Sequence, residues 1–352
     1  MKSLDLASFV ALVENGDPVR EVSVDGVDFC AGNISGAVYE RVSFRGTKLR
    51  QAAMKDCTIV ACDFSDADLS SVDFTESVFV DCVFDGASFV GANFNSVPLR
   101  GGSARRCDFS RADLRDAVFN ACNLTEARLG QAQLEATAFI ECVTTGIDLS
   151  GAILFRTVMM EVDLTQATLA GMRCDQTVFN KAKFAGADLS GLELVRSQFM
   201  AADLTGANLS GARLVQSGFK GAKLVGARLD GAKAANAQFV EADLSQATCA
   251  GADFFQALFV DAVAVGTRFD NAKLAQAIFH RARCSSARFD GADLEYTDFS
   301  YADLSGCTFR ENHWLRTKFH STRRDGVNLP AGQSMLMDDD ELAAAERWAT
   351  AT

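Results

Sequence analysis

Residues 201–230 read AADLTGANLSGARLVQSGFKGAKLVGARLD, and this stretch decides the fold. A large apolar residue recurs every five positions, as in Leu204 and Leu209, and a small residue such as Ala202 or Ala207 stands two places before it. A period of five matches neither an α-helix, with about 3.6 residues per turn, nor a flat strand, with a period of about two. The pattern therefore predicts a chain that turns a corner every five residues, with the large and small positions pointing inward.

The same frame runs without insertion or deletion from Val24 to Leu329, which makes 62 repeats. Of the 27 Phe residues, 24 occupy the large position. Four corners would close a square coil, so that each coil takes four repeats and the region makes about 15 coils. Residues 20 apart should then stack, and one column consists of Phe alone over eight coils: Phe179, Phe199, Phe219, Phe239, Phe259, Phe279, Phe299 and Phe319.

The repeat resembles that of the pentapeptide-repeat family, whose A(D/N)LXX pattern is matched by Ala67-Asp68-Leu69, Ala112-Asp113-Leu114, Ala187-Asp188-Leu189 and Ala292-Asp293-Leu294. The resemblance covers about residues 22–329. It implies an all-β fold, a right-handed quadrilateral β-helix in which each coil stacks on the next.

We expect three segments. Residues 1–20 form an N-terminal capping helix and turn, with Ser3 ahead of the apolar residues of the helix and Asn15-Gly16 at its end. Residues 21–330 form the β-helix, and residues 331–352 form a C-terminal tail with a short helix that begins after an acidic run. Such caps protect the terminal coils from pairing with other chains.

Glycine is frequent at two of the four predicted corners, for example at Gly206, Gly226, Gly211 and Gly231. Glycine suits a turn that needs a positive φ, such as type II. We expect a different turn type at the other two corners, where glycine is rare.

The cysteines and histidines do not form a predicted chemical site. Ten of the 11 Cys occupy inward positions as core fillers, and only Cys30 points outward. His280 and His320 share an outward column two coils apart and are expected at the surface, about 10 Å from each other, too far to share a metal. We predict no catalytic residue, no metal site, no cofactor and no enzymatic activity.

Charge and hydropathy narrow the choice of partners. The net charge is −12, which disfavours direct binding to nucleic acid or to an anionic membrane. No apolar stretch reaches the length of about 18 residues that a membrane span needs, and the N-terminus lacks a signal-peptide cleavage site. The expected location is the cytoplasm, with secretion as an effector left open.

Outward residues on the Phe-column face are apolar more often than on the other faces. This strip is predicted to bind a partner protein or a second copy of the chain, unless its β-branched residues merely favour strand formation. The residues assigned to this surface are Val118, Ile140, Val158, Met160, Val178, Met200, Val240, Leu258 and Val260.

Two local departures from the repeat carry positive charge. Residues 98–106 contain a Pro, two Gly and three Arg, and predict a bulge or kink with an exposed basic patch. The last coil combines Trp314 with Arg316 and Arg323, which we assign as a second contact site for a partner.

These features favour a non-catalytic scaffold or adaptor that docks proteins, in a role such as a bacterial secretion accessory or effector. The resemblance also implies an alternative, a DNA mimic that modulates or protects DNA gyrase or topoisomerase IV. The two differ in charge distribution, because a mimic needs a continuous acidic face, whereas outward columns such as Asp163, Lys183 and Asp203 mix both signs.

Overall fold

The computed structural model describes residues 1–329, 334–341 and 344. The chain divides into two compact units, Met1–Ala182 and Lys183–Thr352, which we describe separately. The short helix expected in the C-terminal tail falls largely on residues 342–343 and 345–352, outside the described residues.

The predicted coil length is confirmed in both units by parallel pairing. In the N-terminal unit Tyr39 pairs with Ile59, and Ile59 with Phe79. In the C-terminal unit Lys183 pairs with Asp203, and the same step links Asp203 with Lys223. Within each unit successive coils are joined by such parallel pairing along their sides, and the protein is a β-helix.

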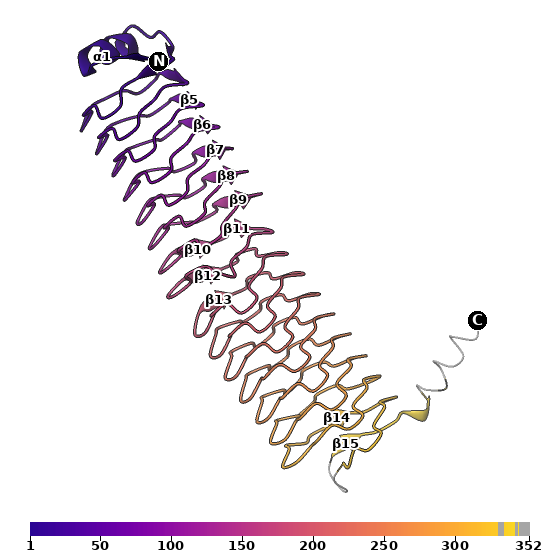
Figure 1. The fold of residues 1–352 in the computed structure, drawn as a ribbon. Helices are drawn as coiled ribbons and strands as arrows, with labels where there is room; N and C mark the ends of the chain where they lie inside the picture. The colour runs from indigo at the N-terminus through magenta and orange to yellow at the C-terminus, as the bar shows by residue number, and fades with distance from the viewer. Residues whose placement is uncertain (330–333, 342–343, 345–352) are drawn as a thin grey trace. The chain divides into compact units, whose positions relative to one another are not determined.

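The N-terminal unit contains the longest ladder, an eight-stranded parallel sheet in the order β11-β9-β8-β7-β6-β5-β4-β2. Figure 1 shows β5 to β9 stacked one above another, each on the same side of successive coils. The strands of this ladder are β2 (Val19–Arg20), β4 (Val38–Glu40), β5 (Thr58–Val60), β6 (Val78–Val80), β7 (Pro98–Arg100), β8 (Val118–Asn120), β9 (Ala138–Ile140) and β11 (Val158–Met159).

Shorter pairings complete the strands. β1 (Lys2–Ser3) pairs with β3 (Val22–Ser23), and β10 (Ile153–Phe155) pairs with β12 (Arg173–Asp175). The C-terminal unit contains β13 (Glu193–Val195), β14 (Thr317–Lys318) and β15 (Met335–Leu336). Elsewhere the coils are joined by single β-bridges, because only one residue per side keeps the strand geometry.

All four corners use a residue with positive φ, so the glycine-rare corners do not differ from the glycine-rich ones in this dihedral angle. In one coil Gly26, Ala31, Gly36 and Arg41 have φ values of 71°, 54°, 73° and 51°. The left-handed conformation is uncommon for residues with a Cβ, but here it recurs at nearly every fifth position from Glu21 to Gly326, where it turns the chain at the corners of the coil. The corners differ instead in their hydrogen bonds, since the turn bond from Val27 N to Val24 O has no counterpart from Val42 N to Tyr39 O.

The interior is filled by stacked rings and by small residues that also make hydrogen bonds. In the C-terminal unit Phe219 stacks on Phe239 with ring centroids 4.8 Å apart, and Phe239 on Phe259 at 5.0 Å. Buried hydroxyl and thiol groups at the small position donate to a carbonyl of the preceding coil, a recurring bond that the periodicity alone did not reveal. Examples are Thr177 to Leu154, Ser217 to Leu194, Thr297 to Leu274 and Cys82 to Ile59.

The N-terminal helix α1 (Leu6–Glu14) closes the first coils. Its N-cap is Asp5 rather than the expected Ser3, because Asp5 Oδ1 accepts the N–H of Ser8 at 2.8 Å while Ser3 lies in β1. Phe9 is fully buried and packs against Phe29, with ring centroids 5.3 Å apart. The helix therefore covers apolar side chains that the first coil would otherwise expose.

The expected distortion at residues 98–106 is confined to two glycines, and the ladder continues through it. Gly101 and Gly102 both have positive φ, 67° and 81°. A Cβ at Gly102 would lie 2.0 Å from the carbonyl oxygen of Cys82, so only glycine fits there. β7 still pairs with β6 and β8. Arg100, Arg105 and Arg106 are exposed, as predicted.

Replacing Thr177 with Val is expected to destabilise the protein by about 1–2 kcal/mol, because the carbonyl of Leu154 loses its 2.8 Å hydroxyl donor inside the core. Thr177→Ser keeps the hydroxyl and is expected to cost less. Urea unfolding of the full chain followed by circular dichroism measures both variants. A Val variant as stable as the wild type would show that the bond contributes nothing.

The packing also predicts the reactivity of the thiols. All 11 Cys are free, and only Cys30 is exposed. A water-soluble thiol reagent should therefore modify one group per native chain and all of them in denaturant. The carboxylate of Asp28 raises the pKa of the Cys30 thiol, so its labelling should be slower than that of a free thiol at the same pH and should accelerate as the pH rises. Fast labelling of two or more groups would contradict the buried positions.

Candidate interaction surfaces

The outward side chains of the long ladder form a flat, largely apolar surface on the N-terminal unit. We define the β4–β11 face by the two outward residues that flank the inward large residue in each strand of this ladder from β4 to β11. The equivalent residues of the coil that follows β11 are included. Residues 20 apart are direct neighbours on this face, so the apolar residues are contiguous along its columns. They are Val38, Val60, Val78, Val80, Pro98, Val118, Ala138, Ile140, Val158, Met160 and Val178.

Several side chains of the β4–β11 face are well exposed. Ile140 and Met160 have relative exposures of 40% and 42%, and Val38 of 39%. Val118, Val158 and Val178 are half-buried, because each is flanked by the coils before and after it. The face thus brings together the five residues of the N-terminal unit that were assigned to the strip from sequence. Arg100 is exposed near its middle and, with Asn120, interrupts one of the two outward columns, while Val78, Pro98 and Val118 continue the other.

The corresponding side of the C-terminal unit is apolar in part. Met200 is 47% exposed, while Val240, Leu258 and Val260 are half-buried. Phe255, on an adjoining side of the coil, is 38% exposed.

The C-terminal segment folds back onto the last coil. β15 pairs in parallel with β14, with Thr317 opposite Met335 and Lys318 opposite Leu336. Ser321 N donates to Asp338 Oδ1 at 2.8 Å, and Arg324 lies 3.4 Å from the same carboxylate. This segment therefore adds one more strand to the ladder, at a step slightly shorter than a full coil.

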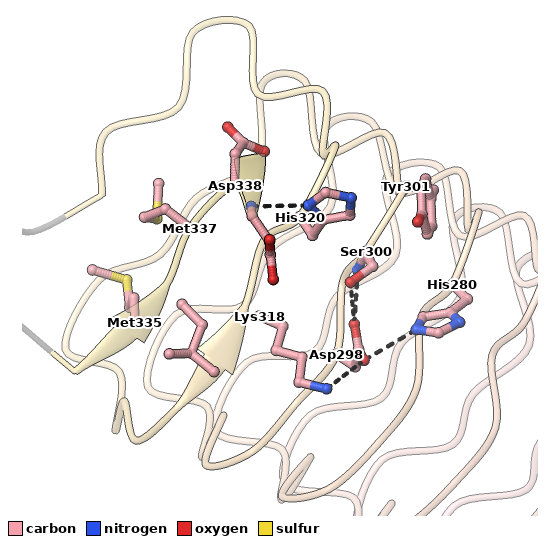
Figure 2. A pocket seen from close by; sticks show the side chains of 11 residues that line it. His280, Asp298, Ser300, Tyr301, Lys318, His320, Met335, Met337 and Asp338 are labelled. Carbon is pink, nitrogen blue, oxygen red and sulfur yellow. Dashed lines mark hydrogen bonds and ion pairs between the residues drawn. The ribbon is translucent and has the colours of Figure 1, made fainter. Parts of the chain in front are cut away.

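A pocket of about 670 Å³ lies between this segment and the last coils. Figure 2 shows His280, Asp298, Tyr301 and Lys318 on one side of it and Met335, Met337 and Asp338 on the other. The lining combines two thioethers and an aromatic ring with several ionisable groups. Such a surface suits the side chain of a partner protein or a small amphipathic molecule.

Asp298 is the best-connected carboxylate of the pocket. It accepts hydrogen bonds from Ser300 N and Oγ at 3.0 and 2.6 Å, and its Oδ2 lies 3.0 Å from His280 Nε2 and 3.4 Å from Lys318 Nζ. Burial disfavours the charged carboxylate, but the bonds from Ser300 and the contact with His280 outweigh burial, so the pKa of Asp298 is lowered. The group is therefore an ionised anchor at neutral pH.

His320 is buried, with 5% exposure, so its expected surface position is wrong. The sequence frame places it outward, but the C-terminal segment covers it. The Asp339 N–H donates to its Nδ1 at 3.1 Å, and the ring of Tyr301 packs edge-on against it at 5.5 Å.

The three predicted contact residues of the last coil do not share one environment. Trp314 is half-buried, with its ring 5.5 Å from that of Phe309 and 5.9 Å from that of Phe319. The Arg323 side chain is 67% exposed and pairs with Asp325 at 2.7 Å. Arg316 is exposed, and its backbone N–H donates to Ser334 O.

Metal-ion clusters and membrane-spanning helices are both absent from the described part of the chain. No group of three or more His, Cys, Asp or Glu residues is placed to hold a metal ion. No helix there is long and apolar enough to cross a membrane.

Family models match this coiled region along most of its length. The model described as pentapeptide repeat region matches residues 52–129. The model described as pentapeptide repeats (8 copies) matches residues 157–191, 197–233, 222–259, 237–276 and 274–311. The chain belongs to the pentapeptide-repeat family. Its β-helix is accordingly the right-handed quadrilateral type that the resemblance implied.

Solved structures of other pentapeptide-repeat proteins are similar to this one. HetL, involved in heterocyst differentiation regulation in the cyanobacterium Nostoc sp. strain PCC 7120, is 18% identical over 83% of this chain and 98% of its own, with a TM-score of 0.29. A pentapeptide-repeat protein of the Arabidopsis thaliana thylakoid lumen is 34% identical over 25% of this chain and 61% of its own, with a TM-score of 0.24. QnrB1, a plasmid-mediated fluoroquinolone resistance protein, is 16% identical over 57% of this chain and 90% of its own, with a TM-score of 0.32. No curated protein matches the chain.

The pocket of this pentapeptide-repeat protein was missed by sequence reasoning. One wall of the pocket is formed by residues 335–339, which follow the last repeat, so the five-residue period does not predict where they lie. The one available signal was the apolar run from Met335 to Met337 directly before three Asp residues, which is typical of a strand end rather than of a solvated tail.

Replacing Asp298 with Asn is expected to lower the free energy of unfolding by about 1 kcal/mol at pH 7, because an ionised acceptor of the Ser300 bonds is removed. A lowered native pKa contributes stability above the ordinary Asp range of about 3.9, and this stability disappears as the pH falls through the native value. The difference between wild type and variant should therefore shrink towards zero in strong acid.

Urea titrations at pH 7 and near pH 3 measure this difference. Asp325→Asn is the control, since that side chain is 71% exposed and its loss should change stability by less than about 0.5 kcal/mol. A penalty for Asp298→Asn that is unchanged in acid would rule out ionisation as its cause.

Proposed function

We propose that this protein is a non-catalytic scaffold that docks a partner protein on its β4–β11 face. One observation carries the proposal: apolar side chains project from successive strands of one ladder and stay exposed, as Ile140 and Met160 do. Exposed apolar surface of this extent on a folded protein marks interaction sites. Strand preference accounts for valine at these positions but not for an exposed methionine.

Rigidity supports the same role. Every coil is bonded to its neighbours by ladder hydrogen bonds, and repeat proteins of this kind present extended surfaces without rearrangement. A partner therefore meets a preorganised surface, which lowers the entropic cost of association.

The double variant Ile140→Asp/Met160→Asp is expected to abolish capture of the partner from a lysate of the native host. Two carboxylates within a desolvated apolar contact would each cost several-fold in affinity. Affinity capture with quantitative mass spectrometry compares the variant with wild type.

Val143→Asp is the matched control, because Val143 is 50% exposed and apolar but lies on another side of the coil. The control should capture the same proteins as wild type. Retention of every captured protein by the double variant would refute docking on the β4–β11 face.

A DNA mimic that acts on gyrase or topoisomerase IV is the second candidate, favoured by the net charge of −12. Pairs across neighbouring coils weigh against it, since Lys48 lies 3.9 Å from Asp28 and Arg281 pairs with Asp261 at 2.7 Å. Such alternation interrupts the acidic surface that a mimic needs. Inhibition or protection of gyrase supercoiling by the purified protein would reverse this ranking.

A further inference from the structure

Carboxylates are concentrated in the two corner rows that border the β4–β11 face. In the N-terminal unit these rows contain seven acidic and three basic residues: Glu21, Asp56, Glu76, Asp81, Asp116, Glu141 and Glu161 against Arg41, Arg156 and Lys181. The other two corner rows of the same unit are balanced, with Asp66 and Glu126 against Arg106 and Arg111. The acidic excess is therefore specific to this side of the coil.

The three cations of the bordering rows are already engaged. Arg41 pairs with Glu21 at 2.8 Å, Arg156 with Glu135 at 2.9 Å, and Lys181 with Glu161 at 2.8 Å. The remaining carboxylates of the rows are exposed and have no ion pair within the described residues. They are Asp56, Glu76, Asp81, Asp116 and Glu141. Five negative charges thus stand along the two margins of an apolar strip without a direct ion pair, with Lys55 near Glu76 and Arg115 near Asp116 as the neighbouring cations.

This arrangement argues against a second copy of the chain as the occupant. A face-to-face dimer would place the acidic margins of one copy against those of the other, and like charges brought together at an interface cost several kcal/mol. The ladder bonds of the face are also internal, so its strands offer no free N–H or C=O groups for an added strand. The occupant must therefore contribute side chains, apolar in the centre and cationic at both edges.

The dimensions of the face fit a helix. Three extended residues span about 10 Å, which matches the diameter of an α-helix with its side chains. The seven strands from β4 to β11 in this ladder cover six steps of about 4.8 Å, or about 29 Å, the length of about 19 helical residues.

We propose that the partner segment is a basic amphipathic α-helix, with an apolar stripe on the β4–β11 face and Lys or Arg residues along both flanks. This inference rests on the proposed docking function and specifies the chemistry of the partner. Arg100 adds a restriction, because a helix seated on the face needs a small or acidic residue at its centre. The partner sequence should therefore contain an amphipathic helix whose apolar stripe is bordered by Lys or Arg residues, with no cationic residue at the centre of the helix.

Fluorescence anisotropy with synthetic peptides of that helical length tests this chemistry on the full-length protein. The probe has a leucine stripe with lysine flanks, and it is compared with a glutamate-flanked peptide of the same stripe and with a scrambled lysine peptide of the same composition. We expect the lysine-flanked helix to bind at least tenfold more tightly than either comparison peptide at low salt. The advantage should vanish near 1 M salt, where the Debye length is about 3 Å.

The variant Asp116→Asn/Glu141→Gln removes one Asp and one Glu charge from the margins, and Asp66→Asn/Glu126→Gln removes the same two types from the balanced rows. Asn tolerates the left-handed corner, and Gln occupies it at Gln131 and Gln176, so both variants should fold. We expect Asp116→Asn/Glu141→Gln to bind the lysine-flanked peptide about fivefold more weakly than wild type, and the control Asp66→Asn/Glu126→Gln to bind it as wild type does. Equal effects of the two variants, tight binding of the glutamate-flanked peptide, or no binding of the lysine-flanked peptide would overturn the proposal.

Capture of the native partner separates this inference from the docking function. If Ile140→Asp/Met160→Asp abolishes capture while Asp116→Asn/Glu141→Gln leaves it unchanged, docking stands and the basic helix is wrong. If both variants abolish capture, the docking function and the basic-helix partner are both supported. If neither affects capture, docking on this face fails together with the inference.

Discussion

The structure depends on one backbone constraint, the left-handed residue at every fifth position. At each corner the chain changes direction by adopting positive φ, whether the residue is Gly36 or Arg41. Four such corners close a coil, and the coil length then aligns N–H and C=O groups of successive coils, as in the bonds from Val24 N to Ser43 O and from Ser43 N to Val22 O. The conformational cost at residues with a Cβ is offset by these ladder bonds and by the rings stacked inside. A single coil would not be stable in isolation, and stability therefore comes from the contacts between stacked coils.

The same constraint also determines which positions of each repeat lie at the surface and which lie in the core. The corner residue and its two outward neighbours stay out of the core, so the side chains at three positions in five vary while the coil is kept. The function of such a protein depends on the side chains at those positions. Columns that carry side chains of similar chemistry over several coils indicate functional surfaces. The apolar residues of the β4–β11 face and the carboxylates beside it are two such runs, and neither is required by the coil. The paired Asp and Lys ladders of the other sides serve solubility and neighbour contacts instead.

The repeat predicted the coil, its register, the inward Phe column and the exposed strip, because each follows from a strict period of five. It did not predict what happens where the period ends. His320 obeys the frame and is nevertheless buried, since residues 334–339 return over it. The glycine-rare corners, in the columns of Gly36 and Arg41, also adopt positive φ, because the closed coil imposes this conformation on residues other than glycine. The hydroxyl bonds of Thr177 and Ser217 were missed because size alone was considered at the small position.

The register of exactly one coil between paired strands has a consequence for how this surface changes in evolution. Duplication or loss of one whole coil within the N-terminal unit would leave every remaining column in phase, so the docking strip would grow or shrink by one rung and keep its borders. An insertion of a single repeat would instead rotate all later side chains by a quarter turn and carry the strip onto another side. Gene duplication in whole coils is thus a route by which the same fold adjusts the length of the segment it recognises.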